Sequence, residues 1–508
     1  MTFTAVTFAP VQGFISSSRK LRDLYGSSLL LSVLAKAIVD DATNRGFEVL
    51  SPALVNTARG TPNLLVISGL YKKGYGRDAL QTKWGEILMA TRLWIESNLD
   101  QFDYHWEPVW KQWHHHAWEY FHAQAETITE ARQQLALVKQ ARAWSGINWT
   151  GESSTLAGCD AIARPRLGLV IDPRKVSNAE EKAEANTFIQ ALKALTPLGE
   201  PFAGKGEQPS VPELIKRLVT YPVVAKTVFA DEKLVDVLPK RFDAIANSAS
   251  VVWFMADGDE VGKYLEKQAA DMPESEASQL KSFSNAMRSW AEGLYNKVPE
   301  ITQQMGTVVY AGGDDLLGAL HDLPGSDGTD IDKALASAHL MDWLKKFPDL
   351  WLQHEQDITV SMGLVFVNGQ VPQREALQHV RLAEASAKAH GRNRFALRLL
   401  FSGGQSIEWV CRWTELPRVL EGYRDREQRS GDKAHWGHLA SDVATLQGRR
   451  ALGGNGARSN AVAEALWAIY FPNLEAPKDL DQPLGEWLSD LAQVLSRLLK
   501  PVRQKVQA

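Results

Sequence analysis

The chain has 508 residues, a hydrophobic content of 44% and a formal net charge of -4. One hydrophobic core does not usually organise so long a chain, so we expect two to four domains. The two cysteines, Cys159 and Cys411, lie far apart, which excludes a four-cysteine zinc site and a disulfide framework. The net charge gives no overall attraction to nucleic acid, so such a partner would require a local basic patch or neighbouring subunits.

Membrane and secretion signals are not evident. No basic leader precedes an apolar stretch at Met1–Pro10, and no segment has the roughly 20 apolar residues that span a bilayer. We therefore expect a cytoplasmic protein with no membrane partner.

The first half begins as an α/β unit. The pattern predicts strands at 3–8, 48–50 and 63–70, and a long helix over 15–40. A Trp-rich stretch from about Arg77 to Trp144 has a helical pattern and resembles an insertion. We expect a further strand at 164–171, and then helices broken by prolines over 177–240, as in an interdomain region.

The Trp-rich stretch contains three consecutive histidines, which suggests a metal site. On a helix, neighbouring side chains point about 100° apart, so His114, His115 and His116 cannot all face one ion. Only His115 and Glu119 have the spacing of a ligand pair. A surface or partly buried structural role is the favoured interpretation.

The second half has the clearest pattern. An apolar run of strand length at 250–256 ends at Asp257 and Gly258. The elements predicted after it are helices at 261–268, 275–297, 330–346 and 374–390, and strands at 307–311, 316–320, 358–367 and 395–400. This order is that of a ferredoxin-like α+β domain. Residues 402–508 are expected to be mainly helical, with one apolar face from Leu484 to Leu498.

Acidic residues occur where two of these strands end. Gly312, Gly313, Asp314 and Asp315 form the turn of a predicted hairpin, beside the strand that ends at Asp257. Glycines allow a tight turn and close approach of a ligand, whereas adjacent carboxylates repel one another unless a cation is bound. We therefore predict that Asp257, Asp314 and Asp315 hold Mg²⁺ or Mn²⁺ for a two-metal nucleotidyl transfer.

In that reaction, the 3′-hydroxyl of one nucleotide would attack the α-phosphate of another, and pyrophosphate would leave. The alternative is that the Gly-Gly-Asp-Asp turn is an ordinary hairpin turn, and that Asp257 and Asp259 belong to an unrelated helix cap. Asp259 is the weakest of the four acids as a ligand because it has a structural role as an N-cap.

Basic residues near the end of the predicted helix 374–390 are candidates for contacts with a triphosphate. They are Lys388, Arg392 and Arg394, with Lys263 as a weaker candidate in the first helix after Asp257. Cations at a helix C-terminus also interact favourably with the helix dipole, so a purely structural role remains open for each.

Three runs together resemble one family. They are Met255–Lys263, which includes Gly258, then Tyr310–Asp315, and then Ala387–Asn393. In this order they resemble the catalytic palm of the large polymerase/cyclase subunit of CRISPR type III effector complexes. The last run is also similar to a stretch of GGDEF diguanylate cyclases. Independently, Pro10–Ile15, Ser18–Asp23 and Gly26–Ser28 resemble the first palm of the Cmr-type subunit.

The resemblance implies two ferredoxin-like palm domains, each holding ATP, with a helical insertion and a helical C-terminal domain. We expect the first palm at 1–175 with its insertion at about 77–150, a helical linker at 176–247, the second palm at 248–402 and the helical domain at 403–508. Gly258, Gly312, Gly313, Lys263, Lys388 and Arg392 are the expected nucleotide contacts. The implied partners are other subunits of the ribonucleoprotein complex, crRNA and target RNA.

The implied activity is synthesis of cyclic oligoadenylates from ATP when the complex binds target RNA. Because the first palm starts almost at Met1, the HD nuclease domain of many members is expected to be absent. The 153–159 region has one cysteine, so we also expect no zinc. Two alternatives remain: a scaffold subunit that only binds RNA and partner subunits, and a stand-alone cyclase or template-dependent polymerase.

Overall fold

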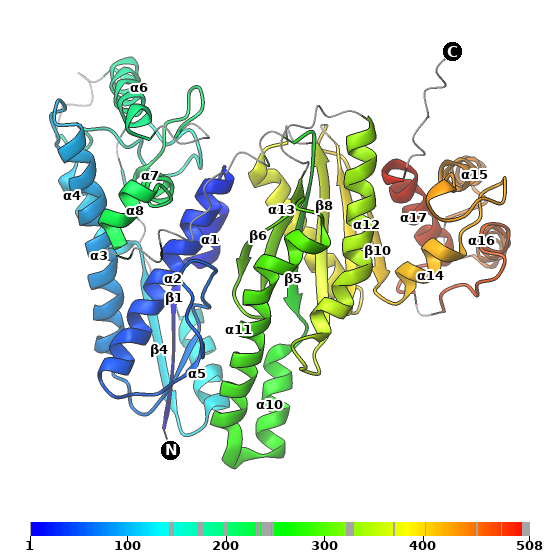
Figure 1. The fold of residues 1–508 in the computed structure, drawn as a ribbon, viewed down its shortest axis with the longest axis horizontal. Coiled ribbons are helices and arrows are strands. Elements are labelled where there is room, and N and C mark those ends of the chain that lie inside the picture. Colours follow the sequence, from blue (N-terminus) through cyan, green and yellow to red (C-terminus); the bar gives the residue numbers. More distant parts are fainter. Residues whose placement is uncertain are drawn as a thin grey trace. The chain divides into compact units, whose positions relative to one another are not determined.

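A computed structural model describes most of the chain, and it divides into two compact units (Figure 1). The described residues are 2–141, 147–149, 151–169, 177–196, 202–229, 231, 234, 245, 248–321, 330–368, 371–401, 403–453, 456–478 and 480–499. The first unit comprises Met1–Asp243, Gly262–Glu292 and Tyr310–Gly313. The second comprises Ala244–Val261, Gly293–Val309 and Asp314–Ala508.

The first unit contains a ferredoxin-like sheet. Its elements are β1 (Phe3–Ala9), α1 (Val11–Ser16), α2 (Leu21–Asn44), β2 (Val49–Ser51), β3 (Leu65–Ser68), α3 (Lys73–Asn98), α4 (Glu107–His116) and β4 (Glu119–Ala125). The strand order is β2-β3-β1-β4, and the neighbouring pairs are antiparallel. This connectivity confirms the first of the two expected ferredoxin-like domains.

The Trp-rich stretch differs from our expectation. We predicted helix throughout, but it includes β4, which pairs with β1 along its whole length. The helices α3 and α4 are therefore the second crossover of the ferredoxin-like fold, and α5 (Ile128–Gln140) follows β4. Glu119 lies in a strand, so the helical pairing of His115 with Glu119 is also wrong.

The remaining elements of this unit are helical. They are α6 (Asn178–Leu195), α7 (Val211–Leu218), α8 (Pro222–Phe229), α10 (Val261–Asp271), the 3-10 turn Pro273–Ser275 and the first part of α11 (Glu276–Ile301). The strand predicted at 164–171 is wrong for residues 164–169, of which 165–168 form a turn, and residues 170 and 171 lie outside the described part.

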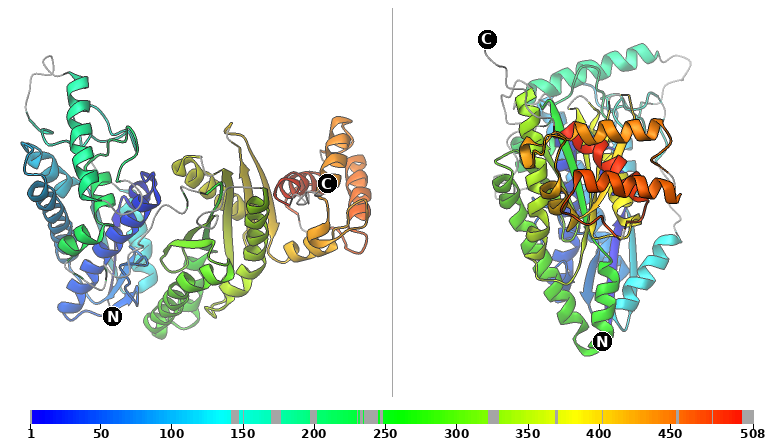
Figure 2. Two further views of the ribbon diagram at one scale, coloured as in Figure 1. Left: turned by 45° about the horizontal axis from the view of Figure 1, so that its top comes forward. Right: turned by 90° about the vertical axis from the view of Figure 1, so that its right-hand side faces the viewer.

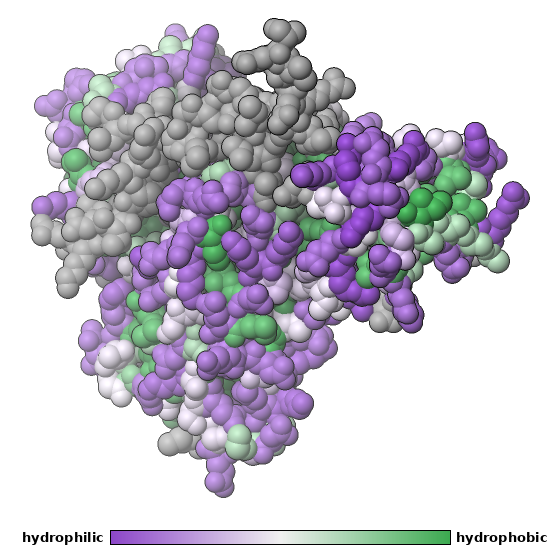
Figure 3. All heavy atoms as spheres, turned by 45° about the vertical axis from the view of Figure 1, so that its right-hand side comes forward, coloured by the Kyte–Doolittle hydropathy of each residue, from purple (hydrophilic) through white to green (hydrophobic). Residues whose placement is uncertain are grey.

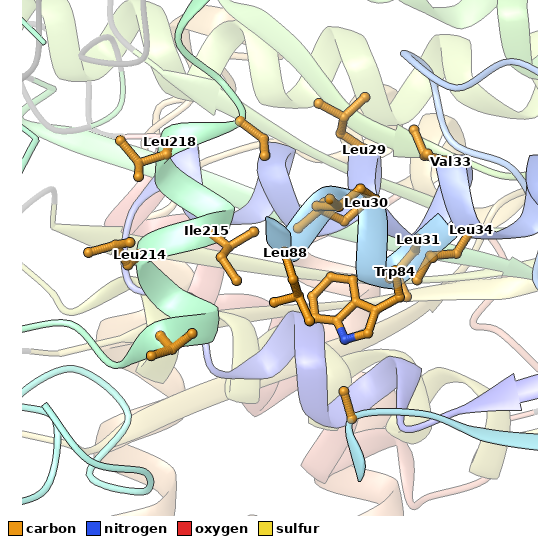
Figure 4. Close-up of a cluster of buried hydrophobic side chains, with 14 of the residues drawn as sticks. Leu29, Leu30, Leu31, Val33, Leu34, Trp84, Leu88, Leu214, Ile215 and Leu218 are labelled. Atoms are coloured by element: carbon orange, nitrogen blue, oxygen red, sulfur yellow. The ribbon is translucent and has the colours of Figure 1, made fainter. Parts of the chain in front are cut away.

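The core of the first unit lies where α2, α3 and α7 meet (Figure 4). Leucines of α2 pack against Trp84 and Leu88 of α3 and against Ile215 of α7. The contact is close, since a Cβ on Gly26 would lie 1.9 Å from the carbonyl oxygen of Lys216. Only glycine allows two helices to approach this closely without a shift.

The second unit contains a six-stranded sheet. Its elements are β5 (Ser250–Gly258), the end of α11, β6 (Gly306–Ala311), β7 (Leu316–His321), α12 (Asp330–Leu352), β8 (Val360–Asn368), α13 (Gln373–Ala389), β9 (Arg394–Leu400) and β10 (Ser406–Arg412). The order is β10-β9-β8-β5-β7-β6. The four strands β8-β5-β7-β6 form the second ferredoxin-like core, which the sequence predicted within a few residues.

The last part of the chain packs on the edge of this sheet. Its elements are α14 (Glu415–Gly422), the 3-10 turn Gly431–Lys433, α15 (Gly437–Gly448), α16 (Ala457–Tyr470) and α17 (Leu484–Leu498). These helices lie beyond β10 (Figure 2), and Trp487 of α17 donates a hydrogen bond to the Val410 carbonyl at 2.8 Å. The helical prediction for this region is confirmed apart from β10, which we expected to be part of it.

On the face shown in Figure 3, the described surface is mainly hydrophilic, with hydrophobic side chains in small areas. In the part of the chain that the structure describes, no helix has the length and apolarity needed to cross a membrane.

Candidate active site

The sheet register brings two of the predicted acids together. β5 and β7 are antiparallel, with Ala256 opposite Leu316. Continued by one residue, this register places Asp257 opposite Asp315. Residues that are directly opposite project from the same face of a sheet, with Cβ atoms about 5 Å apart. The apolar run of β5 and the hairpin therefore determine the position of this acid pair.

The carboxyl group of Asp257 lies close enough to that of Asp315 to change its pKa. Desolvation raises the pKa of Asp315 well above its usual value, and the hydrogen bond with Asp257 and the charges of Asp314 and Asp257 raise it further, against the opposing charge of Lys388. Because the side chain of Asp315 is still exposed to solvent, we regard the neighbouring carboxyl groups as the main cause. Two ionised carboxylates are therefore unfavourable at this position unless a cation lies beside them.

Asp314 lies beside the end of β5 rather than in this pair. A Cβ on Gly258 would be 3.0 Å from the Asp314 Cβ and 2.9 Å from a methyl group of Val261. Gly258 is thus required for the strand end to approach the hairpin this closely.

The two glycines of the hairpin have different roles. Gly313 has a φ of 139°, which favours glycine. At Gly312, a Cβ would lie 1.8 Å from the Tyr310 hydroxyl oxygen. Both glycines are consistent with the tight turn predicted from the sequence.

Lys388, which we predicted as a phosphate contact, is paired with carboxylates. Its ammonium forms ion pairs with Asp257 and with Glu384, the latter at 2.5 Å. Burial alone would lower the pKa of Lys388, but the hydrogen bonds and charges of Asp257 and Glu384 raise it above the usual value. Lys388 is therefore a stable cation beside the acid pair.

Asp259 has a structural role, but its contacts are with residues at the start of β8 and on the turn after α13 rather than those of the helix N-cap that we expected. Its carboxylate accepts hydrogen bonds from the hydroxyls of Thr359 at 2.8 Å and Ser361 at 2.7 Å, and from the backbone N–H of Asn393 at 2.9 Å. The residue is only 6% exposed. These contacts occupy both of its oxygens, so Asp259 is unsuited to bind metal in this arrangement.

The other predicted basic contacts are spread more widely. Arg392 is 44% exposed, and its guanidinium lies 3.8 Å from the Glu260 carboxylate. Arg394 is buried and forms an ion pair with Asp481. Lys263 is exposed on α10, which packs in the first unit, so its role as a nucleotide contact stays a prediction.

The acid pair fits a magnesium or manganese ion. Mg²⁺ is usually held by one or two carboxylates together with substrate phosphates, and Asp257 and Asp315 supply that number at a strand end. Within the described residues, no three His, Cys, Asp or Glu side chains are arranged as a complete metal-binding group. The remaining ligands would therefore have to come from the substrate, from water or from a movement of Asp314.

Several residues of this site were missed by the sequence analysis. Glu384 could have been found, because it lies four residues before Lys388 on one helix. Thr359, Ser361 and Asp481 could not, because their contacts with Asp259 and Arg394 depend on the pairing of distant elements.

Comparisons with known proteins agree with this architecture. Residues 251–396 match the family model described as Cas10/Cmr2, second palm domain, and residues 3–66 match CRISPR-associated protein Cmr2, N-terminal. A comparison with curated proteins gave no match.

Three solved structures share the fold. The type III-B Cmr-beta complex in its apo state has a chain that matches with a TM-score of 0.59 and 10% identity, over 98% of this chain and 81% of that one. A chain of the same complex bound to cognate target RNA matches with a TM-score of 0.51 and 10% identity, over 98% of this chain and 82% of that one. A chain of the apo Csm1-Csm4 cassette matches with a TM-score of 0.50 and 12% identity, over 98% of this chain and 70% of that one.

The match at 3–66 covers strands of the first ferredoxin-like sheet, and the match at 251–396 covers the four strands of the second ferredoxin-like core. Residues 3–66 are therefore similar to the N-terminal domain of Cmr2, and residues 251–396 are similar to the second palm domain of Cas10/Cmr2.

Proposed function

We propose that this chain converts ATP to cyclic oligoadenylates, as a subunit of an RNA-guided type III complex that has bound its target RNA. The observation that carries the proposal is the acid pair Asp257–Asp315 at the end of β5, with Lys388 as its counterion. The fold alone does not carry it, because one fold hosts many activities. A carboxyl pair with a nearby cation fits chemistry on phosphate groups.

The proposed roles follow from the contacts. Asp257 and Asp315, with Asp314 beside them, would hold Mg²⁺ or Mn²⁺. When bound, such ions activate a 3′-hydroxyl and neutralise the charge that develops as pyrophosphate leaves an α-phosphate. For this, Asp315 must be ionised, and Lys388 must leave the Asp257 carboxylate.

The side chains around the acids would bind the triphosphate. Lys388, once released from Asp257, and the exposed Arg392 supply positive charge. Gly312 and Gly313 would allow the phosphates to approach the backbone of the hairpin. ATP is thus the proposed substrate, as the family resemblance also implies.

The proposed partners are other subunits of a type III ribonucleoprotein, crRNA and target RNA. The Cmr-beta complex with which this chain shares its fold was solved bound to cognate target RNA. Since the net charge of the chain is -4, we expect neighbouring subunits to contribute much of the RNA contact.

The test uses the assembled complex, labelled ATP, Mg²⁺ or Mn²⁺ and cognate target RNA. The wild type should form oligoadenylates only when target RNA is present, and Asp314→Ala/Asp315→Ala should abolish the product without weakening RNA binding. Asp78→Ala, which removes an exposed acid of the first unit, should retain full activity.

A scaffold role is the alternative, and one observation favours it: Lys388 forms an ion pair with Asp257, the acid that would have to bind metal. If the wild-type complex binds target RNA normally but forms no product with either metal ion, the scaffold role is correct and the cyclase proposal is wrong.

A further inference from the structure

The connection between α13 and β9 is a strained turn. Gly391, Arg392 and Asn393 have φ values of 104°, 63° and 50°. Three successive residues in the left-handed region are unusual, and only glycine adopts it without a steric cost. The Arg392 N–H donates to the Ala387 carbonyl at 3.2 Å, which ends the helix but does not by itself fix the turn.

One side of this turn is held by Asp259. Its carboxylate accepts the Asn393 N–H at 2.9 Å and is itself fixed by the hydroxyls of Thr359 and Ser361. In addition, the Asp259 N–H donates to the Thr359 carbonyl at 2.8 Å. Because Asp259 follows Asp257 by two residues, the turn is connected to the strand end that carries the acid pair.

The other side is held by the C-terminal helical region. The Arg394 Nε donates to the Arg392 carbonyl at 2.8 Å, and its Nη1 forms an ion pair with Asp481 in the segment before α17. A Cβ on Gly391 would lie 2.8 Å from Arg394 Nη2, so glycine leaves room for this guanidinium. The side chain of Arg394 is only 8% exposed, which keeps it in this position.

We propose that Asp259 and the Arg394–Asp481 ion pair are positioning residues that hold the left-handed turn and thereby present Arg392 to the triphosphate. This inference rests on the proposed function for the role of Arg392. It assigns the C-terminal helical region a part in nucleotide binding, although that region contributes none of the acids. Neither Asp259 nor Asp481 contacts substrate in this scheme.

Hydrogen exchange of the full chain tests whether these residues hold the turn. Asp259→Asn places an amide where the Asn393 N–H needs an acceptor, and Asp481→Asn removes the charge that orients Arg394. Both variants should speed amide exchange in residues 389–395 about tenfold, the effect of losing one hydrogen bond to a charged group, and should leave α2 unchanged.

The exchange experiment has a control variant, Glu475→Gln, and a second test variant, Asp481→Asn, that does not depend on the folding of Asp259→Asn. Glu475→Gln removes another acid of the same segment, whose ion pair with Lys478 is 79% exposed on each side, and should leave exchange as in the wild type. Asp481 is 42% exposed, so Asp481→Asn should fold even if Asp259→Asn does not. Wild-type exchange in Asp481→Asn would overturn the proposal.

A double-mutant cycle with ATP tests the link to Arg392. In the assembled complex, Asp259→Asn should raise the Kd for ATP about tenfold, and it should add nothing in an Arg392→Ala background because both changes remove the same contact. Additive effects would show that Asp259 acts by another route and would overturn the positioning role. If the wild type does not bind ATP, the proposed function fails, and the exchange experiment still decides whether the turn is held.

Discussion

The ammonium of Lys388 forms an ion pair with the carboxylate of Asp257, so the acid at the end of β5 has a protein cation as its counterion. A divalent cation that binds Asp257 must replace this contact. The pair therefore lowers the affinity of the acids for metal, while it keeps Lys388 close to the position where phosphates would bind.

We predict opposite effects of Lys388→Met on metal affinity and on activity. Without the lysine, Asp257 has no adjacent counterion, and the affinity for Mn²⁺ should rise about tenfold, as expected when a competing close charge is removed. Oligoadenylate synthesis should fall, because the triphosphate loses a cation. Mn²⁺ binding can be followed by electron paramagnetic resonance, with Lys281→Met, an exposed lysine paired with Glu48, as the control. Unchanged Mn²⁺ affinity would show that Lys388 does not compete with the metal ion for Asp257.

Gly258→Ala should disturb the acid pair through sterics alone. The new methyl group would lie 3.0 Å from the Asp314 Cβ and 2.9 Å from Val261, so the hairpin must shift. We expect a loss of about 1–3 kcal/mol of stability, typical of overpacking, and a loss of activity. Gly262→Ala is the matched control, because a Cβ there meets no atom within 4 Å. Thermal unfolding of the two variants should differ clearly, and equal melting temperatures would refute the steric argument.

Glu276→Gln should loosen the start of α5. The carboxylate of Glu276 accepts hydrogen bonds from the N–H groups of Ile128 and Thr129 at 2.9 and 2.8 Å, and from the Thr129 hydroxyl at 2.7 Å. It thus caps a helix N-terminus, where negative charge is favourable. Loss of the charge should cost about 1–2 kcal/mol, visible as faster amide exchange in residues 128–135. Glu274→Gln, an exposed neighbour in the chain, should have no such effect.

His354 predicts a pH dependence of stability. Burial lowers the pKa of His354 to about 4, and its Nδ1 accepts the Gln356 N–H at 2.9 Å. As pH falls below about 6.5, the unfolded chain takes up a proton here and the folded chain does not, so stability is complete above that pH and is lost toward pH 4.

At pH 5 this loss amounts to about 2 kcal/mol relative to pH 7. His354→Asn cannot take up the proton, so its stability should fall less over this range than that of the wild type. Melting temperatures measured between pH 7 and pH 5 provide the check, with His105→Asn, an exposed imidazole, as the control. Parallel curves for wild type and His354→Asn would show that the buried imidazole does not contribute.

The second ferredoxin-like core could be predicted from the sequence because its signals are local. The apolar run of β5 ends at an Asp-Gly pair, and the Gly-Gly-Asp-Asp turn separates two strand patterns of equal length. Once β5 and β7 are paired, the positions of Asp257 and Asp315 follow from the register.

Two strands were missed for a different reason. β4 alternates buried Phe121 and Ala123 with polar residues, but it follows a histidine-rich helix and contains few residues that favour strands. β10 also alternates, with Trp409 and Cys411 buried, yet it borders a long helical region. In both, a short period-two pattern competed with a longer helical one.

The contacts that hold the turn at 391–393 were beyond sequence analysis. Asp259 and Asn393 are 134 residues apart, and Arg394 and Asp481 are 87 apart. Neither pair has a characteristic spacing, because their approach depends on strand pairing and on the docking of α17 against β10.

The first unit is discontinuous in the chain, since residues 262–292 belong to it. Leu280 of α11 packs with Phe3, Leu50, Val66 and Ile128. During synthesis, these four side chains are therefore not covered by Leu280 until α11 has left the ribosome. A fragment that stops at residue 247 would expose this apolar face and remove the Glu276 carboxylate from the N–H groups of Ile128 and Thr129. Truncation of the gene at that apparent boundary should therefore yield an aggregation-prone product, whereas a fragment reaching residue 313 retains the whole unit.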